Sequence, residues 1–311
     1  MTALKQHSTV SGRKSGRSRM ASQQQLWGVL FALPAILGFL IFTVGPMLVS
    51  FAMSLTDWTI GAPAHFIGLG NYQRMLTDDR FWKSLSVTSY YTVGAVPAVL
   101  IVGFLVALLV NTGQKGKSFW RTIYYLPTLV PAVASAVLWI WIFNPDSGLL
   151  NSLLAMVGLP GSNWIYSEDT SVPSLILMNT WGFGNAMVIF LAGRQGVPAQ
   201  LYEAVALDGG GAWTKFRHVT LPFMTPTIFY NLVVGVIGTF QVFNQAYIMT
   251  KGGPNNSTLF YIFYLYTKAF NDSEMGYASA MAWVLFVIVL VITVLLFRNS
   301  RWVYYEMGDA R

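Results

Sequence analysis

Long apolar segments alternate with short polar ones over most of the chain. Six segments are apolar over roughly 20 residues or more, the length that a helix needs to cross about 30 Å of hydrocarbon. None of the six has a Lys, Arg, Asp or Glu in its interior. They are residues 26–55, 84–111, 119–143, 172–193, 224–249 and 276–297. The pattern predicts an all-α integral membrane fold with six transmembrane helices.

Two of these segments have features of their own. The first, LWGVLFALPAILGFLIFTVGPMLVSF, has an apolar core too long for a signal peptide and no small-residue cleavage site after it. We therefore expect it to stay in the protein as a helix. The fourth is the weakest candidate, because Asn179, Gly182, Gly184 and Asn185 interrupt it.

Composition agrees with a membrane protein. Hydrophobic residues make up 54% of the 311 residues and charged residues only 10%, whereas a soluble domain has about 25% charged residues. The chain has no cysteine, which excludes a disulfide framework, a cysteine-ligated zinc and a thiol nucleophile.

The positive charges lie mainly on one side of the predicted spans. Fourteen of the nineteen Lys and Arg residues fall in the N-terminal tail, in the loops 112–121 and 194–222, and after the last span. Because Lys and Arg are concentrated on the cytoplasmic side, both termini are expected to be cytoplasmic. The charge is then an orientation signal, and no nucleic-acid partner is expected.

The permease domain is expected to span residues 26–298, between two cytoplasmic tails. Residues 1–25 are rich in Ser, Gly and basic residues without apolar periodicity, which predicts a disordered tail. We expect this tail to be a solvated orientation signal, and contact with anionic membrane lipid is the alternative. Residues 299–311 form the second tail.

Two apparent chemical motifs do not hold. GQKGKS at 113–118 ends like a phosphate-binding loop, but Asn111 occupies the position of the first glycine. The three histidines, His7, His65 and His218, lie in separate segments, so no metal site is expected.

The loop before the fifth span has an unusual composition, EAVALDGGGAWTKFRHVTLP from Glu203 to Pro222. Pro198 precedes a short run of helix formers and Gly209–Gly211 follow it, which is the order expected at the two ends of a helix. A second segment with Trp213, Phe216 and Val219 spaced three apart comes next, and we expect Pro222 to end it. The loop 195–222 is therefore predicted to form a small helix-turn-helix at the cytoplasmic surface.

This loop has two interpretations. An amphipathic helix resting on lipid accounts for Trp213 and the basic residues. It does not account for Glu203 and Asp208, which anionic headgroups would repel, or for the glycine turn. A docking surface for a soluble cytoplasmic protein accounts for all of these features.

The loop resembles the EAA motif of ABC importer permeases. That motif reads Glu-Ala-Ala, three residues, Gly, nine residues, Ile, one residue and Leu-Pro. The matching positions are Glu203, Ala204, Gly209, Leu221 and Pro222, while Val205 and Val219 replace the third and the Ile positions. The resemblance implies a type I ABC importer permease, in which this loop fits a cleft on the ATP-hydrolysing subunit and transmits its closure.

Three further segments, residues 68–93, 124–151 and 247–258, resemble the carbohydrate-uptake group of these permeases. The resemblance implies a transport subunit that moves a di- or oligosaccharide, or a related polyol or sugar derivative, by alternating access. It implies no catalysis and no cofactor in this chain. The implied partners are a second, related permease chain, a dimer of cytoplasmic ATPases and an extracytoplasmic sugar-binding protein.

Polar side chains inside the fourth and fifth spans are candidates for the substrate path, because a polar group facing lipid is costly. They are Asn179, Trp181, Asn185, Tyr230, Asn231, Gln241, Asn244, Gln245 and Tyr247. Amides can hydrogen-bond sugar hydroxyls, and aromatic rings can pack on sugar faces. The same residues can also join helices without touching a substrate, and the second permease can hold all the contacts instead.

Two other functions would require different sequence features. A carrier driven by an ion gradient would require internal repeats or acidic residues within the membrane, and a membrane enzyme would require a convergent cluster of His, Asp, Ser or Cys. Neither pattern is found in the sequence.

Overall fold

The computed structural model describes residues 16–110 and 116–304. The predicted tails at 1–15 and 305–311, and residues 111–115 of the second loop, lie outside the described residues. The chain divides into two compact units, residues 1–53 and 54–311, which are described separately. Within the described ranges the regular structure is helical, apart from one isolated bridge between Thr56 and Phe66.

The first unit is one long helical span. Helix α1 (Gly16–Phe39) continues through a π-helical turn, Leu40–Val44, into α2 (Gly45–Ser54). Helix α1 begins at Gly16, inside the tail that was predicted over residues 1–25. Nearly all of the described side chains of this unit are exposed, as expected for a span that meets lipid or another chain.

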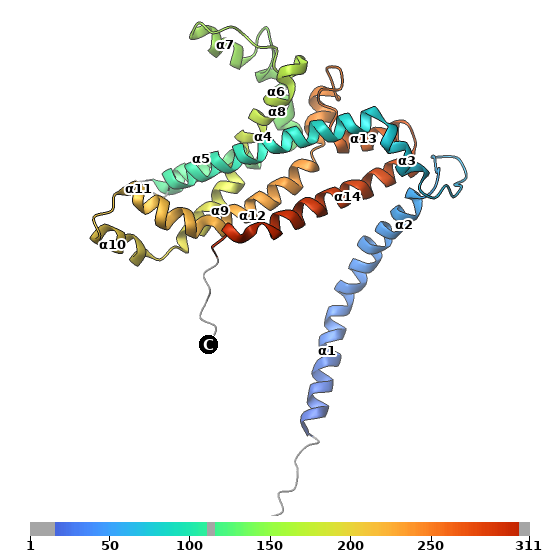
Figure 1. Ribbon diagram of the computed structural model, residues 1–311, viewed down its shortest axis with the longest axis horizontal. Coiled ribbons are helices and arrows are strands. Elements are labelled where there is room, and N and C mark those ends of the chain that lie inside the picture. Colours follow the sequence, from blue (N-terminus) through green and yellow to red (C-terminus); the bar gives the residue numbers. More distant parts are fainter. Residues whose placement is uncertain (1–15, 111–115, 305–311) are drawn as a thin grey trace, which may run out of the picture. The chain divides into compact units, whose positions relative to one another are not determined.

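The second unit is built from helices at several angles (Figure 1). Helix α12 packs against α4 and α14, and α4 also packs against α8 and α9. The helices are α3 (Gly70–Thr77), α4 (Asp79–Val110), α5 (Lys117–Tyr125), α6 (Ala132–Ile142), α7 (Leu149–Met156), α8 (Glu168–Trp181), α9 (Gly184–Gln195), α10 (Ala199–Leu207), α11 (Ala212–Lys215), α12 (Leu221–Phe240), α13 (Tyr261–Tyr266) and α14 (Met275–Arg298). Figure 1 shows α10 and α11 at one end of the α4–α12–α14 layer and α3 and α13 at the other.

Four helical spans are long and apolar enough to cross a membrane: 23–54, 79–110, 212–240 and 275–298. Two of the predicted spans are bent pairs of helices. Residues 118–129 and 132–142 meet at 94°, and α8 and α9 meet at 46°. With each bent pair counted as one span, the total is six. The first bend follows from Pro131, which lacks the N–H that would continue the helix, and the second from Gly182, which ends α8.

The fifth span differs from its prediction at both ends. It is helical from Ala212 to Phe240, so the prediction that Pro222 ends the preceding segment was wrong. A π-helical turn, Phe216–Thr220, precedes that proline, as Leu40–Val44 precedes Pro46. We attribute the continuity to this wider turn, which relieves the clash of a proline ring with the preceding turn. At the other end, α12 stops at Phe240 rather than at 249, and a separate π-helical turn follows at Ala246–Thr250.

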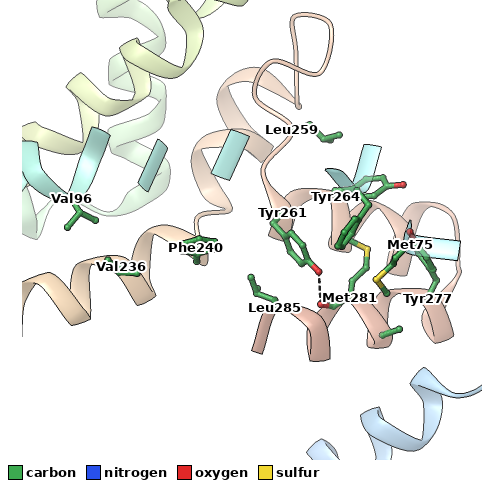
Figure 2. Packing of buried hydrophobic residues seen from close by; sticks show 12 residues of the cluster. Met75, Val96, Val236, Phe240, Leu259, Tyr261, Tyr264, Tyr277, Met281 and Leu285 are labelled. Atoms are coloured by element: carbon green, nitrogen blue, oxygen red, sulfur yellow. Dashed lines mark hydrogen bonds between the residues drawn. The ribbon is translucent and has the colours of Figure 1, made fainter. Parts of the chain in front are cut away.

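The main buried cluster joins α3, α4, α12, α13 and α14 (Figure 2). Tyr261 and Tyr277 are completely or almost completely buried in it, beside Met281. A buried hydroxyl must find a partner, and the Tyr261 hydroxyl donates to the carbonyl of Met281 at 2.8 Å. The backbone N–H of Tyr261 donates to Thr88 Oγ1 at 2.9 Å, which fixes α13 against α4.

Asp78 connects the helices at the α3–α13 end. Its Oδ2 atom accepts hydrogen bonds from the hydroxyls of Tyr264 at 2.7 Å and Tyr277 at 2.6 Å. Its Oδ1 atom accepts from the backbone N–H groups of Arg80 at 3.0 Å and Phe81 at 3.3 Å, which caps α4. Partial burial opposes the charged form, but these four hydrogen bonds outweigh it and hold the pKa of Asp78 below its ordinary value.

We expect Asp78→Ala to lower the free energy of unfolding by about 3 kcal/mol at pH 7, because two buried tyrosine hydroxyls and the α4 cap lose a charged acceptor. The pKa of Asp78 is lowered in the folded protein, so its stabilisation is complete above the ordinary carboxyl pKa of about 4 and is lost as the pH falls below it. The gap between wild type and variant should therefore narrow on acidification. Thermal unfolding of the purified protein, followed by tryptophan fluorescence from pH 7 to pH 3, measures this gap.

Asp79→Ala is the matched control, since Asp79 is the adjacent exposed carboxylate in the first turn of α4. It should leave stability nearly unchanged at every pH. An equal loss in both variants would contradict the role given to Asp78.

Candidate functional site

The loop singled out in the sequence forms two helices joined by a tight glycine turn. Helix α10 ends where the N–H of Gly210 donates to the carbonyl of Val205 at 2.8 Å and that of Gly209 to Ala206 at 3.1 Å. This pair of bonds is a Schellman motif, which needs a residue with positive φ just after the helix, and Gly209 has φ +76°. At Gly210 a Cβ atom would lie 2.8 Å from the carbonyl oxygen of Val205. The helix-turn-helix prediction is therefore met by the geometry of these two glycines.

The outward face of α10 carries the acidic and small residues of the motif. Glu203 and Ala204 are exposed, and Leu207 is 89% exposed. Leu201 and Val205 are half-buried and face inward. Leu207 therefore adds an apolar side chain to the same exposed face as the motif acid.

The inward face of the loop is tied to the spans. Tyr202 and Thr220 share a hydrogen bond of 3.1 Å between their hydroxyls, which joins α10 to the π-helical turn. Phe216 in that turn contacts Phe104 of α4, with ring centroids 6.2 Å apart, and Phe104 packs edge-on against Phe190 of α9 at 5.2 Å. Of the two remaining motif residues, Leu221 is 37% exposed and Pro222 is half-buried at the start of α12.

A cavity of about 260 Å³ lies among α4, the α8–α9 pair and α12. Three amides reach its wall, Asn179, Asn185 and Asn231, together with the hydroxyl-bearing Thr239. The rest of the wall is aliphatic side chains and the glycines Gly182, Gly235 and Gly238. A few polar groups in an apolar wall are typical of a small-molecule site, although the volume is just below the usual range of about 300–1,000 Å³.

The other predicted path residues lie elsewhere. Trp181 packs edge-on against Trp139 at 5.8 Å, so it belongs to a buried aromatic cluster. Gln241, Asn244 and Gln245 follow the end of α12 and do not line this cavity. Tyr247 lines a second cavity, of about 680 Å³, near the start of α4.

Sequence reasoning missed the small residues of the cavity wall. Gly235 lies against Val96 of α4, where a Cβ atom would come within 3.3 Å of a Val96 methyl group. Gly238 faces open space, with no atom within 4 Å of a Cβ atom placed there. The signal was present in the sequence as small residues in a transmembrane helix, which mark close helix contacts.

The break between α8 and α9 is held by a close approach of α5. A Cβ atom on Gly184 would lie 2.7 Å from Thr128 Cγ2, 3.0 Å from the carbonyl oxygen of Tyr124 and 3.1 Å from Tyr125 Cα. Two of these atoms belong to the backbone and cannot rotate away. Because Gly184 has no side chain, the end of α5 can approach the α8–α9 break closely beside the cavity.

The chain belongs to the family of binding-protein-dependent transport system inner membrane components, which matches residues 99–304. The chain is therefore a multi-pass membrane protein that serves as a transport subunit, and it is not an enzyme. The EAA motif is a feature of this family.

Two relatives and one solved structure are similar over nearly the whole chain. The probable ABC transporter permease protein YesP of Bacillus subtilis (strain 168) is 43% identical over 299 residues, 94% of this chain and 96% of that protein. The arabinooligosaccharides transport system permease protein AraP of the same organism is 31% identical over 294 residues, 93% of each chain. One chain of a bacterial ABC transporter involved in the import of the acidic polysaccharide alginate has a TM-score of 0.80 at 24% identity, covering 92% of this chain and 100% of that chain. The predicted fold class, a type I ABC importer permease, is confirmed.

Gly184→Ala is expected to lower the free energy of unfolding by about 1–3 kcal/mol, because the added methyl group overpacks a contact with the backbone of α5. Gly238→Ala is the matched control, since its methyl group meets open space and Ala favours the helix by about 1 kcal/mol. Thermal unfolding of both variants in the same detergent makes the comparison. If Gly184→Ala were as stable as Gly238→Ala, α5 would not approach the break as closely as described.

Proposed function

We propose that this chain is the permease subunit of an ATP-driven importer that moves a di- or oligosaccharide, or a related polyol or sugar derivative, by alternating access. The observation that carries the proposal is the continuous set of contacts between the exposed loop and the walls of the amide-lined cavity. Family membership supports transport that depends on a binding protein. The relative named for arabinooligosaccharides supports a carbohydrate cargo.

Glu203, Ala204, Gly209, Leu221 and Pro222 form the coupling element of this proposal. The exposed face of α10 docks on a cytoplasmic ATPase, and Gly209 provides the turn behind it. Movement of α10 reaches α12 through the Tyr202–Thr220 hydrogen bond and reaches α4 and α9 through Phe216. Because α4, α9 and α12 are also the cavity walls, closure of the ATPases changes the access to the cavity.

The substrate path is proposed to run through the cavity. Asn179 and Asn185 line it directly, with side chains suited to an uncharged hydroxyl-rich ligand. The five other predicted path residues, Trp181, Gln241, Asn244, Gln245 and Tyr247, would act beyond the cavity or as its support. The small volume is in keeping with a path that a second permease chain completes.

The complete importer contains further subunits in this proposal. A second, related permease faces the cavity, a dimer of ATPases docks on the two cytoplasmic loops, and an extracytoplasmic sugar-binding protein delivers the cargo. The distribution of Lys and Arg supports cytoplasmic termini and a cytoplasmic α10.

Glu203→Ala tests the coupling role. It should lower sugar uptake by about tenfold, the effect of about 1.4 kcal/mol lost at a docking interface, while the complex still assembles in the membrane. Uptake and sugar-stimulated ATP hydrolysis are measured in proteoliposomes that hold the complete importer. Asp169→Ala, which removes an exposed acid at the start of α8, serves as the control and should leave both unchanged. Normal uptake with Glu203→Ala would remove the docking role.

Gly238→Leu tests the substrate path. The new side chain fits the open space beside α12 and fills part of the cavity, so uptake should fall by about tenfold or more without loss of the assembled complex. Gly38→Leu in α1 is the matched control, because that glycine also has open space around it and lines neither cavity. Uptake that survives Gly238→Leu would place the path outside this cavity.

A further inference from the structure

We propose that the second cavity binds the carboxylate of an acidic sugar, so that this importer takes up anionic oligosaccharides. This inference rests on the proposed function and specifies its substrate class. The cavity has a volume of about 680 Å³ and lies among the start of α4, the turn Ala246–Thr250, the loop that follows it, and α13. All of these elements belong to the second unit. By the charge distribution, it faces outward.

Two cations line this cavity, Arg80 and Lys251. In the described part of the chain neither forms an ion pair, whereas Arg74 pairs with Glu274 at 3.0 Å and Lys268 with Asp272 at 2.9 Å. No acidic side chain reaches the cavity wall within the described residues. The unpaired cations are therefore available to a ligand that brings its own negative charge.

Two acids near the cavity, Asp78 and Glu274, already have other partners, and the exposed Asp79, which precedes Arg80, does not line the cavity wall. Both oxygens of Asp78 accept hydrogen bonds from tyrosine hydroxyls or backbone N–H groups, and Glu274 contacts Arg74 and Lys268. The surrounding loops are acidic as a whole, since the segments expected outside carry eight Asp and Glu against five Lys and Arg. Among the described residues, the charged side chains in the cavity wall are both cations, which is the reverse of the surrounding loops.

The loop that presents Lys251 is held rigidly in place. Lys251 adopts φ +49°, and its N–H donates to the carbonyl of Ala246 at 2.6 Å. Thr258 Oγ1 donates to the carbonyl of Gly253 at 2.7 Å, and Ser257 shares a hydrogen bond of 2.9 Å with Ser171 of α8. These hydrogen bonds fix the backbone that carries Lys251, while its exposed side chain remains free to reach a ligand.

The remaining wall suits a sugar ring rather than a small inorganic anion. Tyr247 lies 6.5 Å from Phe263, between ring centroids, and its own ring stacks on Phe243 at 5.2 Å. Asn256 and Asn271 add amides that can donate to and accept from hydroxyls. A neutral sugar would use the rings and amides but leave both cations unpaired. A uronic acid residue, which has a sugar ring and a carboxylate, uses the whole wall.

The experiment compares acids with their uncharged esters on the complete importer in nanodiscs. The probes are diuronic acids built from galacturonate, glucuronate or mannuronate, each beside its methyl ester. Saturation-transfer difference NMR gives their affinities. We expect at least one diuronic acid to bind about tenfold more tightly than its ester, and this preference to weaken with added salt.

Three variants assign the preference to the cavity. Arg80→Gln combined with Lys251→Gln should make acid and ester bind alike. Arg80→Lys combined with Lys251→Arg keeps both charges and should keep the preference. Lys83→Gln removes an exposed cation from the same helix, α4, outside the cavity, and should leave the preference unchanged.

Each outcome decides the inference. Equal binding of every acid and its ester to the wild type overturns it, as does a preference that survives the double Gln variant. If the Gln pair weakens only the association with the binding protein, regardless of sugar charge, the cavity receives an acidic protein side chain and the inference is wrong. Neutral sugars that still stimulate ATP hydrolysis would leave the proposed importer standing in those cases. If no carbohydrate of either kind stimulates hydrolysis or uptake, the proposed function itself fails.

Discussion

A helix in hydrocarbon must satisfy its own backbone hydrogen bonds. The architecture of the second unit depends on the positions where a helix leaves some of these hydrogen bonds unformed. Proline removes one donor each time it occurs, and the chain compensates locally. Pro226 cannot donate to the carbonyl of Pro222, and the hydroxyl of Thr225 donates to that carbonyl at 2.6 Å instead. Other helices end inside the spans, as α8 does at Trp181, before Gly182, and α12 does at Phe240.

These interruptions are where polar groups become available inside the spans. The α8–α9 break brings Gly182 and Asn185 to the cavity wall, and the end of α12 brings Thr239. The same breaks divide the unit into short rigid pieces joined at defined points. In the proposed coupling, a movement of α10 is passed between these segments and acts at the joints beside the cavity. Transporters commonly bind substrate at interrupted helices for this reason.

Much of the fold could be predicted from the sequence, because hydrophobic length alone predicts spans. The helix in the loop 195–222 could be predicted equally well, because Pro198 and the glycines at 209–211 mark the two ends of α10 through local geometry alone. The continuity of the helix through Pro222 could not be predicted from the pattern, because whether a helix bends or continues at a proline depends on the turn that precedes it.

The residues that line the first cavity were predicted only in part, for a related reason. Polarity marked Asn179 and Trp181 alike, but the direction of each side chain depends on the bend between α8 and α9. Asn179 faces the cavity, whereas Trp181 faces the aromatic cluster around Trp139. The glycines of α12 carry no side chain that would draw attention, although they create the space that the amides enclose.

Five Lys and Arg residues are expected on the outer side of the membrane, and they differ in what the fold places beside them. Lys and Arg are depleted outside the membrane, so each one that remains there runs against the trend. Two of them, Arg74 and Lys268, are accounted for by acids on neighbouring elements, and Lys83 is exposed on α4. Arg80 and Lys251 come from segments far apart in sequence, and the fold brings them to one cavity without an acid in its wall. Counting charges along the chain treats all five alike, and only their placement separates the two that pair with acids, Arg74 and Lys268, from the two that line the cavity.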